Sequence, residues 1–325
     1  MDSRFGPSML PATPVAANVD VILNPHAGGL KRSRVRRSVV GEADRAGARV
    51  HETRNLEELD EVARAIAGRG AQAVVLAGGD GSFMCGLTAL HRAFGGTVLP
   101  PIGLAPAGTV GTVARNLGLR GPAIAARVLR QACVGGSDLA SCQTLRVRDD
   151  RGGDRVGFIF GAGLVGRFFD VYRRAARPGR SAAAFIAARV FAGSLVGSKL
   201  ARDVLAPTPC ALTVDGDRHP AAAFSLVVAS VVRDLGLHFL LTYRAGERAD
   251  QFHVVASGLS PRALGPQMPR VMAGRRLVGE PRVDALARSL RLDFPDPVAY
   301  VLDGEVLDAA HVVVDIGPTL RIVRA

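Results

Sequence analysis

Short apolar runs alternate with longer polar stretches along the first 135 residues of the chain. The runs have the length of buried strands, and the stretches between them have helical character. Strands that alternate with helices predict a mostly parallel sheet with helices on both faces. The predicted strands are 19–23, 48–52, 73–77 and 101–105, and the predicted helices are about 31–46, 57–69, 82–93, 109–118 and 121–133.

From about residue 138 the pattern changes to strand-like runs separated by turn signals such as Asp149–Gly153 and Asp215–Asp217. Such runs predict an antiparallel, sandwich-like second domain. A helical stretch at about 167–202 is inserted in it. The predicted strands are Gln143–Val147, Arg155–Gly161, Ala211–Val214, Ala222–Val231, His238–Tyr243, Gln251–Ala256, Leu290–Phe294, Val298–Leu302, His311–Ile316 and Leu320–Val323.

Length and composition fit a folded protein of two domains, with 325 residues of which 48% are hydrophobic. Residues 1–18 hold three prolines without periodicity, so we expect a flexible arm there and not a secretory signal. No stretch reaches the roughly 18–20 uninterrupted apolar residues of a membrane span. Four scattered cysteines without C-x-x-C spacing indicate free thiols in a reducing compartment, so we expect a cytoplasmic protein.

The formal net charge of +12 suits nucleic acid, an anionic membrane surface or an anionic substrate. With three Tyr, no Trp and no basic–aromatic sheet pattern, a nucleic-acid-binding module is excluded from our expectations. A composition that uses Arg in place of Lys is an alternative origin for much of this charge.

The most informative motif is Gly78-Gly79-Asp80-Gly81-Ser82, which ends an apolar run and precedes a helical segment. Glycines let backbone N–H groups approach phosphate, and a helix N-terminus presents unpaired donors with a positive dipole. An aspartate in such a loop would repel phosphate unless a metal or a reacting hydroxyl requires it. The motif therefore indicates nucleotide chemistry.

Three other segments accompany this loop. The first strand ends in Asn24-Pro25-His26-Ala27-Gly28-Gly29, the fourth leads into Pro106-Ala107-Gly108-Thr109, and Asp303-Gly304-Glu305 stands near the C-terminus. In this order the four segments resemble the diacylglycerol kinase catalytic family, which includes bacterial lipid kinases, sphingosine kinases and ceramide kinases. The resemblance spans roughly residues 19–325. NAD kinases and phosphofructokinases carry relatives of the Gly-Gly-Asp-Gly loop alone.

The resemblance implies an α/β fold in which a Rossmann-like nucleotide-binding domain adjoins an antiparallel β-sandwich domain that accepts the lipid. The first domain would cover residues 19–137 and be joined by the C-terminal segment, about 310–325. The second would cover residues 138–309, with the helical insert 167–202. Asp303–Glu305 would then lie beside the cleft between the domains.

The resemblance also implies ATP-dependent transfer of the γ-phosphoryl group to a hydroxyl of a membrane lipid, such as diacylglycerol, a sphingoid base or ceramide. Such transfer needs positioned phosphates, Mg²⁺ and a carboxylate that takes the hydroxyl proton. The implied catalytic residues are Asp80, Asp303 and Glu305; Asp80 and Asp303 are also the implied Mg²⁺ ligands, and either could be the base. The implied nucleotide-binding residues are Asn24, Pro25, Thr53, Gly78, Gly79, Gly81, Ser82, Gly108 and Thr109.

Alternatives remain open for several of these residues. Thr53 also suits a helix N-cap, and Asp303-Gly304 also suits an exposed hairpin turn. Gly111 stands where the family usually has Asn. In residues 230–255 only Asp250 is a plausible remnant of the accessory Mg²⁺ site that many bacterial members carry, so the resemblance does not extend to that site. A non-catalytic, nucleotide- or lipid-binding pseudokinase is therefore one alternative function.

The insert at 167–202 is both basic and apolar, with arginines such as Arg173, Arg174 and Arg177 among aromatic and aliphatic residues. A basic amphipathic helix suits an anionic membrane surface, and a core helix with a solvated arginine face is the other interpretation. The expected partners are a nucleotide, a lipid substrate and an anionic membrane, to which the protein would bind peripherally; a homodimer is also possible. A soluble NAD-kinase-type phosphotransferase is the second alternative function.

Overall fold

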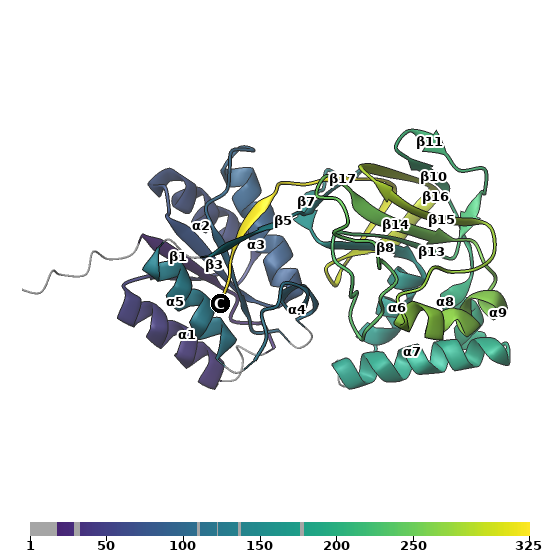
Figure 1. The fold of residues 1–325 in the computed structure, drawn as a ribbon, viewed down its shortest axis with the longest axis horizontal. Helices are drawn as coiled ribbons and strands as arrows, with labels where there is room; N and C mark the ends of the chain where they lie inside the picture. The colour runs from purple at the N-terminus through teal and green to yellow at the C-terminus, as the bar shows by residue number, and fades with distance from the viewer. Residues whose placement is uncertain (1–17, 29–32, 109–110, 122, 136–137, 176–178) are drawn as a thin grey trace, which may run out of the picture.

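The computed structural model of the protein describes residues 18–28, 33–108, 111–121, 123–135, 138–175 and 179–325. These residues form two lobes that lie side by side (Figure 1). The chain enters the second lobe after residue 142 and returns to the first after residue 316. The predicted fold class, an α/β lobe with a parallel sheet followed by an antiparallel lobe, is confirmed.

The first lobe is a six-stranded sheet with helices on both faces (Figure 1). The strand order is β2-β1-β3-β4-β18-β5; β5 is antiparallel to β18, and the other neighbours are parallel. Strands β1 and β3 are buried along their whole length, as parallel strands covered on both faces are. The strands are β1 (Val19–Leu23), β2 (Arg49–Glu52), β3 (Ala73–Gly78), β4 (Ile102–Pro106), β5 (Leu139–Cys142) and β18 (Leu320–Val323).

The helices of this lobe form two layers. Helices α1 and α5 contact each other on one face of the sheet, and α2 and α3 contact each other on the other (Figure 1). Because the sheet is parallel, its carboxyl ends meet at one edge, from which α2, α3 and α4 begin. The helices are α1 (Ser33–Ala46), α2 (Leu56–Arg69), α3 (Asp80–Ala93), α4 (Thr112–Asn116) and α5 (Ile124–Val134).

The second lobe is built on one ten-stranded antiparallel sheet that curls around its own core. Strand β16 makes this possible, because its register with β17 shifts between Asp293 and Val298. Its first half pairs with β10 and its second half with β8. The strands are β6 (Leu145–Asp149), β7 (Asp154–Gly157), β8 (Ile159–Gly163), β10 (Ala211–Val214), β11 (Asp217–Arg218), β13 (Leu226–Ser230), β14 (Phe252–Ser257), β15 (Arg282–Ala287), β16 (Ser289–Leu302) and β17 (Glu305–Ile316), beside a small pair, β9 (Thr208–Pro209) and β12 (Ala223–Phe224).

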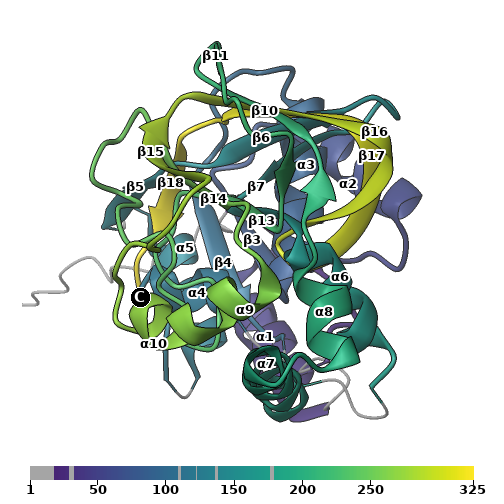
Figure 2. The same ribbon diagram turned by 90° about the vertical axis from the view of Figure 1, so that its right-hand side faces the viewer.

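A group of helices covers one face of this sheet (Figure 2). Their apolar residues form a cluster with Leu226 and Val228 of β13 and Val255 of β14. The predicted insert 167–202 corresponds to the first three of these helices. They are α6 (Leu164–Arg173), α7 (Arg180–Leu195) and α8 (Lys199–Leu205), joined by α9 (Pro261–Leu264), a 3-10 turn (Gly265–Gln267) and α10 (Met268–Met272).

The structure corrects three details of the sequence-based picture. His238–Tyr243 is not a strand but part of an irregular segment, in which Leu237 and His238 have positive φ angles of 54° and 64°. Strand β15 and the short helices at 261–272 were not predicted. Leu290–Phe294 and Val298–Leu302 are one bent strand, β16, because Pro295 and Pro297 interrupt its apolar pattern at the bend without ending it.

Two predicted boundaries also differ from the structure. These are the boundary between the domains at residues 137/138 and the point, about residue 310, where the chain was expected to rejoin the first domain. β5 lies in the sheet of the first lobe, because it pairs with β18. Strand β17 continues the sheet of the second lobe as far as Ile316, so the returning segment is only 317–325. The predicted arm at 1–18 lies outside the described residues except for Asn18.

Within the part of the chain that the structure describes, no single helix is long and apolar enough to cross a membrane. Helices α7 and α8 together satisfy that length and composition, but the chain bends by 102° between them.

Candidate functional site

Two cavities meet at the carboxyl edge of the parallel sheet. The larger, of about 510 Å³, extends from the Gly79–Gly81 loop into the second lobe. The smaller, of about 230 Å³, lies over the ends of β1 and β3 and the start of α2. Gly81 and Glu305 line both cavities, so the glycine-rich loop and the hairpin after β16 form their common wall.

The predicted glycine positions are required for close packing at this edge. A Cβ atom on Gly78 would lie 2.5 Å from the Cβ of Ser82, and one on Gly108 would lie 2.5 Å from the Cα of Gly79. The loops after β3 and β4 therefore touch backbone to backbone. A Cβ on Gly81 would collide with the carboxylate of Glu305. A side chain at Gly108 would push the two loops apart, while one at Gly78 or Gly81 would displace the Ser82 or Glu305 side chain.

The smaller cavity brings together residues predicted for the nucleotide. Asn24 donates to Ser82 Oγ at 2.9 Å and accepts from the His26 N–H at 2.9 Å, which fixes its orientation. Thr53 also lines this cavity. The N-cap alternative for Thr53 is wrong, because Asn55 caps α2 by accepting from the Glu58 N–H at 2.8 Å.

Other predicted nucleotide residues have different places. Pro25 and Gly78 line neither cavity, Gly79 and Gly108 line the larger one, and Thr109 lies outside the described residues. Sequence reasoning missed Arg54, which lines the smaller cavity and brings a positive charge to it. Arg54 directly follows Thr53, which was predicted to bind the nucleotide, and this position could have identified it.

Asp80 holds the loop after β4. Its carboxylate accepts from the Thr112 N–H at 2.7 Å and from the Val113 N–H at 3.1 Å, and so caps the first turn of α4. Burial raises the pKa of Asp80 above its usual value, against the opposing effect of these hydrogen bonds. The Arg115 charge also lowers this pKa, so Arg115 is a cation of the site that sequence reasoning missed.

Gly111 precedes α4 with a left-handed backbone, φ 61° and ψ 46°. Glycine and asparagine are the residues that enter this conformation at least cost. Gly111 therefore retains a conformation that the family's usual Asn also tolerates. Among the described residues, no atom outside the two chain neighbours of Gly111 lies within 4 Å of the position of a Cβ here.

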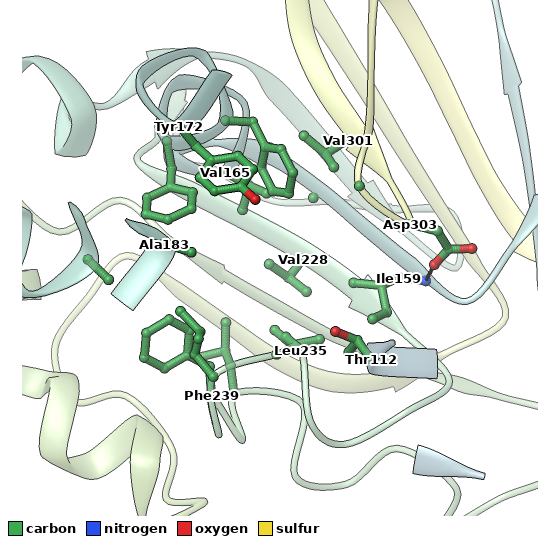
Figure 3. Close-up of a pocket in the computed structure, with 18 of the residues that line it drawn as sticks. Thr112, Ile159, Val165, Tyr172, Ala183, Val228, Leu235, Phe239, Val301 and Asp303 are labelled. Atoms are coloured by element: carbon green, nitrogen blue, oxygen red, sulfur yellow. Dashed lines mark hydrogen bonds between the residues drawn. The ribbon is translucent and has the colours of Figure 1, made fainter. Parts of the chain in front are cut away.

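Asp303 forms a hairpin turn and also places its carboxylate in the site, so it combines the two interpretations made from sequence. Asp303 and Gly304, with φ angles of 48° and 90°, form the two-residue turn between Leu302 and Glu305. The Asp303 side chain is nevertheless buried, and its carboxylate accepts from the Phe158 N–H at 3.0 Å and the Ile159 N–H at 2.9 Å (Figure 3). Burial, and next the charge of Asp80, raises the pKa of Asp303 well above its usual range.

The two carboxylates are suited to a divalent cation that arrives with a nucleotide. The negative charge of Asp80 repels that of Asp303 and raises the pKa of Asp303, and a bound cation would reduce this repulsion. Mg²⁺ is commonly held by one or two carboxylates together with substrate phosphates and waters. No group of three or more His, Cys, Asp or Glu residues able to hold a metal occurs among the described residues. Asp250, the candidate remnant of an accessory site, forms an exposed ion pair with Arg288.

The larger cavity is apolar except at the end nearest the first lobe. Its walls come from β8, β13, α6, α7, α10 and the segment 235–241 (Figure 3). Asp80, Thr112, Asp303 and Glu305 provide polar groups at that end. Its volume is within the range of about 300–1,000 Å³ typical of ligand pockets. Sequence reasoning did not find this cavity, because apolar residues from many separate elements form it.

Comparison with known proteins agrees with the resemblance read from the motifs. Residues 18–142 match the diacylglycerol kinase catalytic domain family. A crystal structure of a diacylglycerol kinase from Bacillus anthracis str. Sterne aligns over 94% of this chain and 96% of its own, with a TM-score of 0.62 and 14% identity. Two further structures of diacylglycerol kinase type from that organism align with TM-scores of 0.64, each at 14% identity over 94% of this chain and over 96% and 97% of their own. No curated protein sequence matches the chain.

The resemblance to this family is therefore confirmed over residues 18–142, which contain three of the four motifs, and the match supports a kinase-type function. At 14% identity the solved structures establish the shared fold and no more.

Proposed function

We propose that the protein is an ATP-dependent lipid kinase, which transfers the γ-phosphoryl group to a lipid hydroxyl at the junction of the two cavities. The observation that carries this proposal is that a small cavity lined by Asn24, Thr53 and Arg54 meets a large apolar cavity at Gly81 and Glu305. Asp80 and Asp303 lie at the polar end of the larger cavity. The matched family, the diacylglycerol kinase catalytic domain, supports the kinase part. The 510 Å³ apolar cavity supports a lipid as the acceptor.

In this mechanism the nucleotide lies in the smaller cavity, with Asn24, Thr53 and Arg54 around it and the N-terminus of α3 directed at its phosphates. Asp80 and Asp303 would hold Mg²⁺, which neutralises phosphate charge when bound. Asp80 also fixes α4, and thereby the position of the Gly108 loop.

The acceptor lipid lies with its chain in the larger cavity and its hydroxyl at the polar end. In this proposal Asp303 accepts the hydroxyl proton, because its buried carboxylate lies at the polar end of the acceptor cavity. Glu305 lies between the cavities, over Gly81, where its charge can orient the attacking hydroxyl.

Both alternatives account for less of the structure. A soluble NAD-kinase-type enzyme has no use for a large apolar cavity that opens toward the carboxylates. A pseudokinase has no need for an apolar cavity whose polar end brings together Asp80, Asp303 and Glu305.

Peripheral binding to an anionic membrane is part of this proposal, through the outer face of α7. Ala183, Ala187 and Phe191 of α7 line the cavity. Phe185 lies on the opposite face and is 63% exposed, and Val196, directly after the helix, is 80% exposed. Arg189 stacks on the Phe185 ring at 5.7 Å, and Arg180 is exposed at the start of the helix. An exposed apolar strip flanked by arginines suits an anionic lipid surface, and this supports a cytoplasmic protein at the membrane.

The insert thus combines the two interpretations made from sequence, a core face and an exposed basic face. Arg167 belongs to the first, because its guanidinium donates to the backbone oxygens of Val204 and Ala206 and to Thr208 Oγ1. Arg177 lies outside the described residues.

The test is to incubate the purified protein with ATP labelled at the γ-phosphate, Mg²⁺ and a total lipid extract, and to identify labelled products by mass spectrometry. We expect a phosphorylated lipid whose formation needs Asp303. Label found only on a water-soluble acceptor, or none in any fraction from an ATP-binding protein, would contradict the proposal.

A further inference from the structure

Helix α4, with five residues, is hydrogen-bonded at both ends to parts of the site. At its start, the Thr112 and Val113 N–H groups donate to Asp80. At its end, the Asn116 side-chain amide donates to the Asp234 backbone oxygen at 2.8 Å, and Asn116 Oδ1 accepts from the Asp234 N–H at 3.1 Å. The two bonds join residues 118 positions apart in sequence and cross from one lobe to the other.

The segment that Asn116 holds has an unusual backbone. Gly236, Leu237 and His238 have consecutive positive φ angles of 104°, 54° and 64°. Non-glycine residues in this region cost free energy and persist only where the surroundings enforce them. Three contacts do so here: the Gly236 N–H donates to Asp234 Oδ1 at 2.8 Å, the Leu235 N–H to the Phe239 oxygen at 3.0 Å, and Asn116 holds Asp234.

This same segment forms a wall of the apolar cavity. Leu235, Leu237, Phe239 and Leu241 line it, and Figure 3 shows Leu235 beside Thr112 with Phe239 farther along the wall. A Cβ on Gly236 would lie 3.2 Å from Thr112 Oγ1, so segment and helix are in close contact. The cavity wall and the acid of the glycine-rich loop are therefore attached to opposite ends of one short helix.

We infer that Asn116 is a positioning residue that sets the wall of the acceptor cavity in register with Asp80 across the lobe boundary. The inference rests on the proposed function, since it assigns a role in aligning the acceptor with the nucleotide. Asn116 itself touches neither ligand in this scheme. Its effect should appear in the use of the acceptor and not in the binding of ATP.

The variant Asn116→Ala removes both bonds to Asp234. A small displacement of reacting groups can cost about 10²-fold in rate, so we expect kcat/KM for the lipid acceptor to fall about 10–100-fold. KM for ATP should stay within about two-fold. Amide exchange in residues 232–241 should accelerate while exchange in β13 and β14 does not. Asn18→Ala is the matched control: it removes the side-chain bonds to the Gly70 oxygen and from Arg49, away from both cavities, and should leave all three readouts unchanged.

The inference is overturned if kcat/KM for the acceptor in Asn116→Ala stays within two-fold of the wild-type value. It is also overturned if KM for ATP rises by the same factor as kcat/KM for the acceptor falls. Should Asn116→Ala not fold, Asn116→Gln, which cannot keep both bonds in the same geometry, is measured instead. Binding of diphenylhexatriene, a neutral apolar fluorophore, separates this test from the proposed function. Weaker binding of it by Asn116→Ala supports the link to the wall even if no lipid is phosphorylated. If the wild type phosphorylates lipid but Asn116→Ala shows the same fluorophore binding and the same amide exchange as the wild type, the role of Asn116 is refuted and the proposed function is not.

Discussion

Among the single residues, the carboxylates show most clearly what a motif can and cannot tell. Sequence reasoning selected Asp80 and Asp303, and the structure brings both to one end of the apolar cavity. The motif could not predict the backbone hydrogen bonds that these carboxylates accept. Asp80 caps α4, and Asp303 anchors the start of β8 through the Ile159 N–H. These partners come from distant parts of the chain, so only the fold reveals them.

Asp303→Asn should reduce kinase turnover by at least about 10²-fold, the scale of a lost base. The amide would also direct an N–H toward backbone donors, so we expect a loss of about 1–3 kcal/mol of stability. Steady-state kinetics and thermal unfolding check both. A folded variant with near-normal turnover would transfer the role of base to Asp80, which Asp80→Asn then tests.

Gly111→Asn should fold normally, because Asn tolerates the left-handed backbone. Gly111 lines the acceptor cavity and not the smaller one, so affinity for ATP should stay unchanged. Gly111→Ala is the control, and should lose about 1–2 kcal/mol of stability. Titration calorimetry decides; lost ATP binding in a folded Gly111→Asn would mean that the loop requires glycine for another reason.

Asp284 provides a pH-dependent contribution to stability. Burial raises its pKa, but hydrogen bonds with His253 and Tyr243 outweigh burial and hold the pKa below its usual value. A lowered folded-state pKa gives stability that is present above the unfolded-state pKa and is lost as the pH falls through the folded-state pKa. The difference in melting temperature between wild type and Asp284→Asn should therefore be largest near pH 7 and shrink below about pH 4. A difference independent of pH would disprove this linkage.

At the scale of elements, the first lobe was readily predicted and the second only in part. The strands β1 and β3 are buried along their whole length, and β3 is a continuous apolar run, while Asp20 is the one polar residue of β1. In the second lobe, the segment containing Leu237 and His238 alternates like a strand but is held in another conformation by tertiary contacts. The edge strand β5 pairs with β18, far away in sequence, and local pattern carries no information on such pairing.

Helix α7 supports the membrane prediction. Replacing Arg180 and Arg189 by Gln should weaken binding to vesicles that contain anionic lipid, and wild-type binding should fall with salt, since exposed charges are screened over about 8–10 Å at physiological ionic strength. Affinity for ATP should not change. The control pair, Arg64→Gln with Arg248→Gln, removes the same charge from exposed positions elsewhere. Equal loss in both pairs would show that net charge, and not this face, determines binding.

At the scale of the whole molecule, function depends on how the lobes meet. Neither cavity is formed by one lobe alone. Gly81 from the first lobe and Glu305 from the second line both cavities. The sequence supplied the chemistry at this junction through the family motifs, while the apolar cavity depends on helices folded over the second sheet. The central claim is that the acceptor occupies this cavity while it reacts.

The most direct test fills the cavity without touching the carboxylates. Ala183 lines the cavity, and its neighbour Ala184 is exposed on the other side of α7. Lipid phosphorylation by Ala183→Phe and Ala184→Phe should be measured with ATP binding as the reference. The account predicts that Ala183→Phe loses most lipid phosphorylation and binds ATP normally, while Ala184→Phe retains both. Undiminished lipid phosphorylation by a folded Ala183→Phe would contradict it.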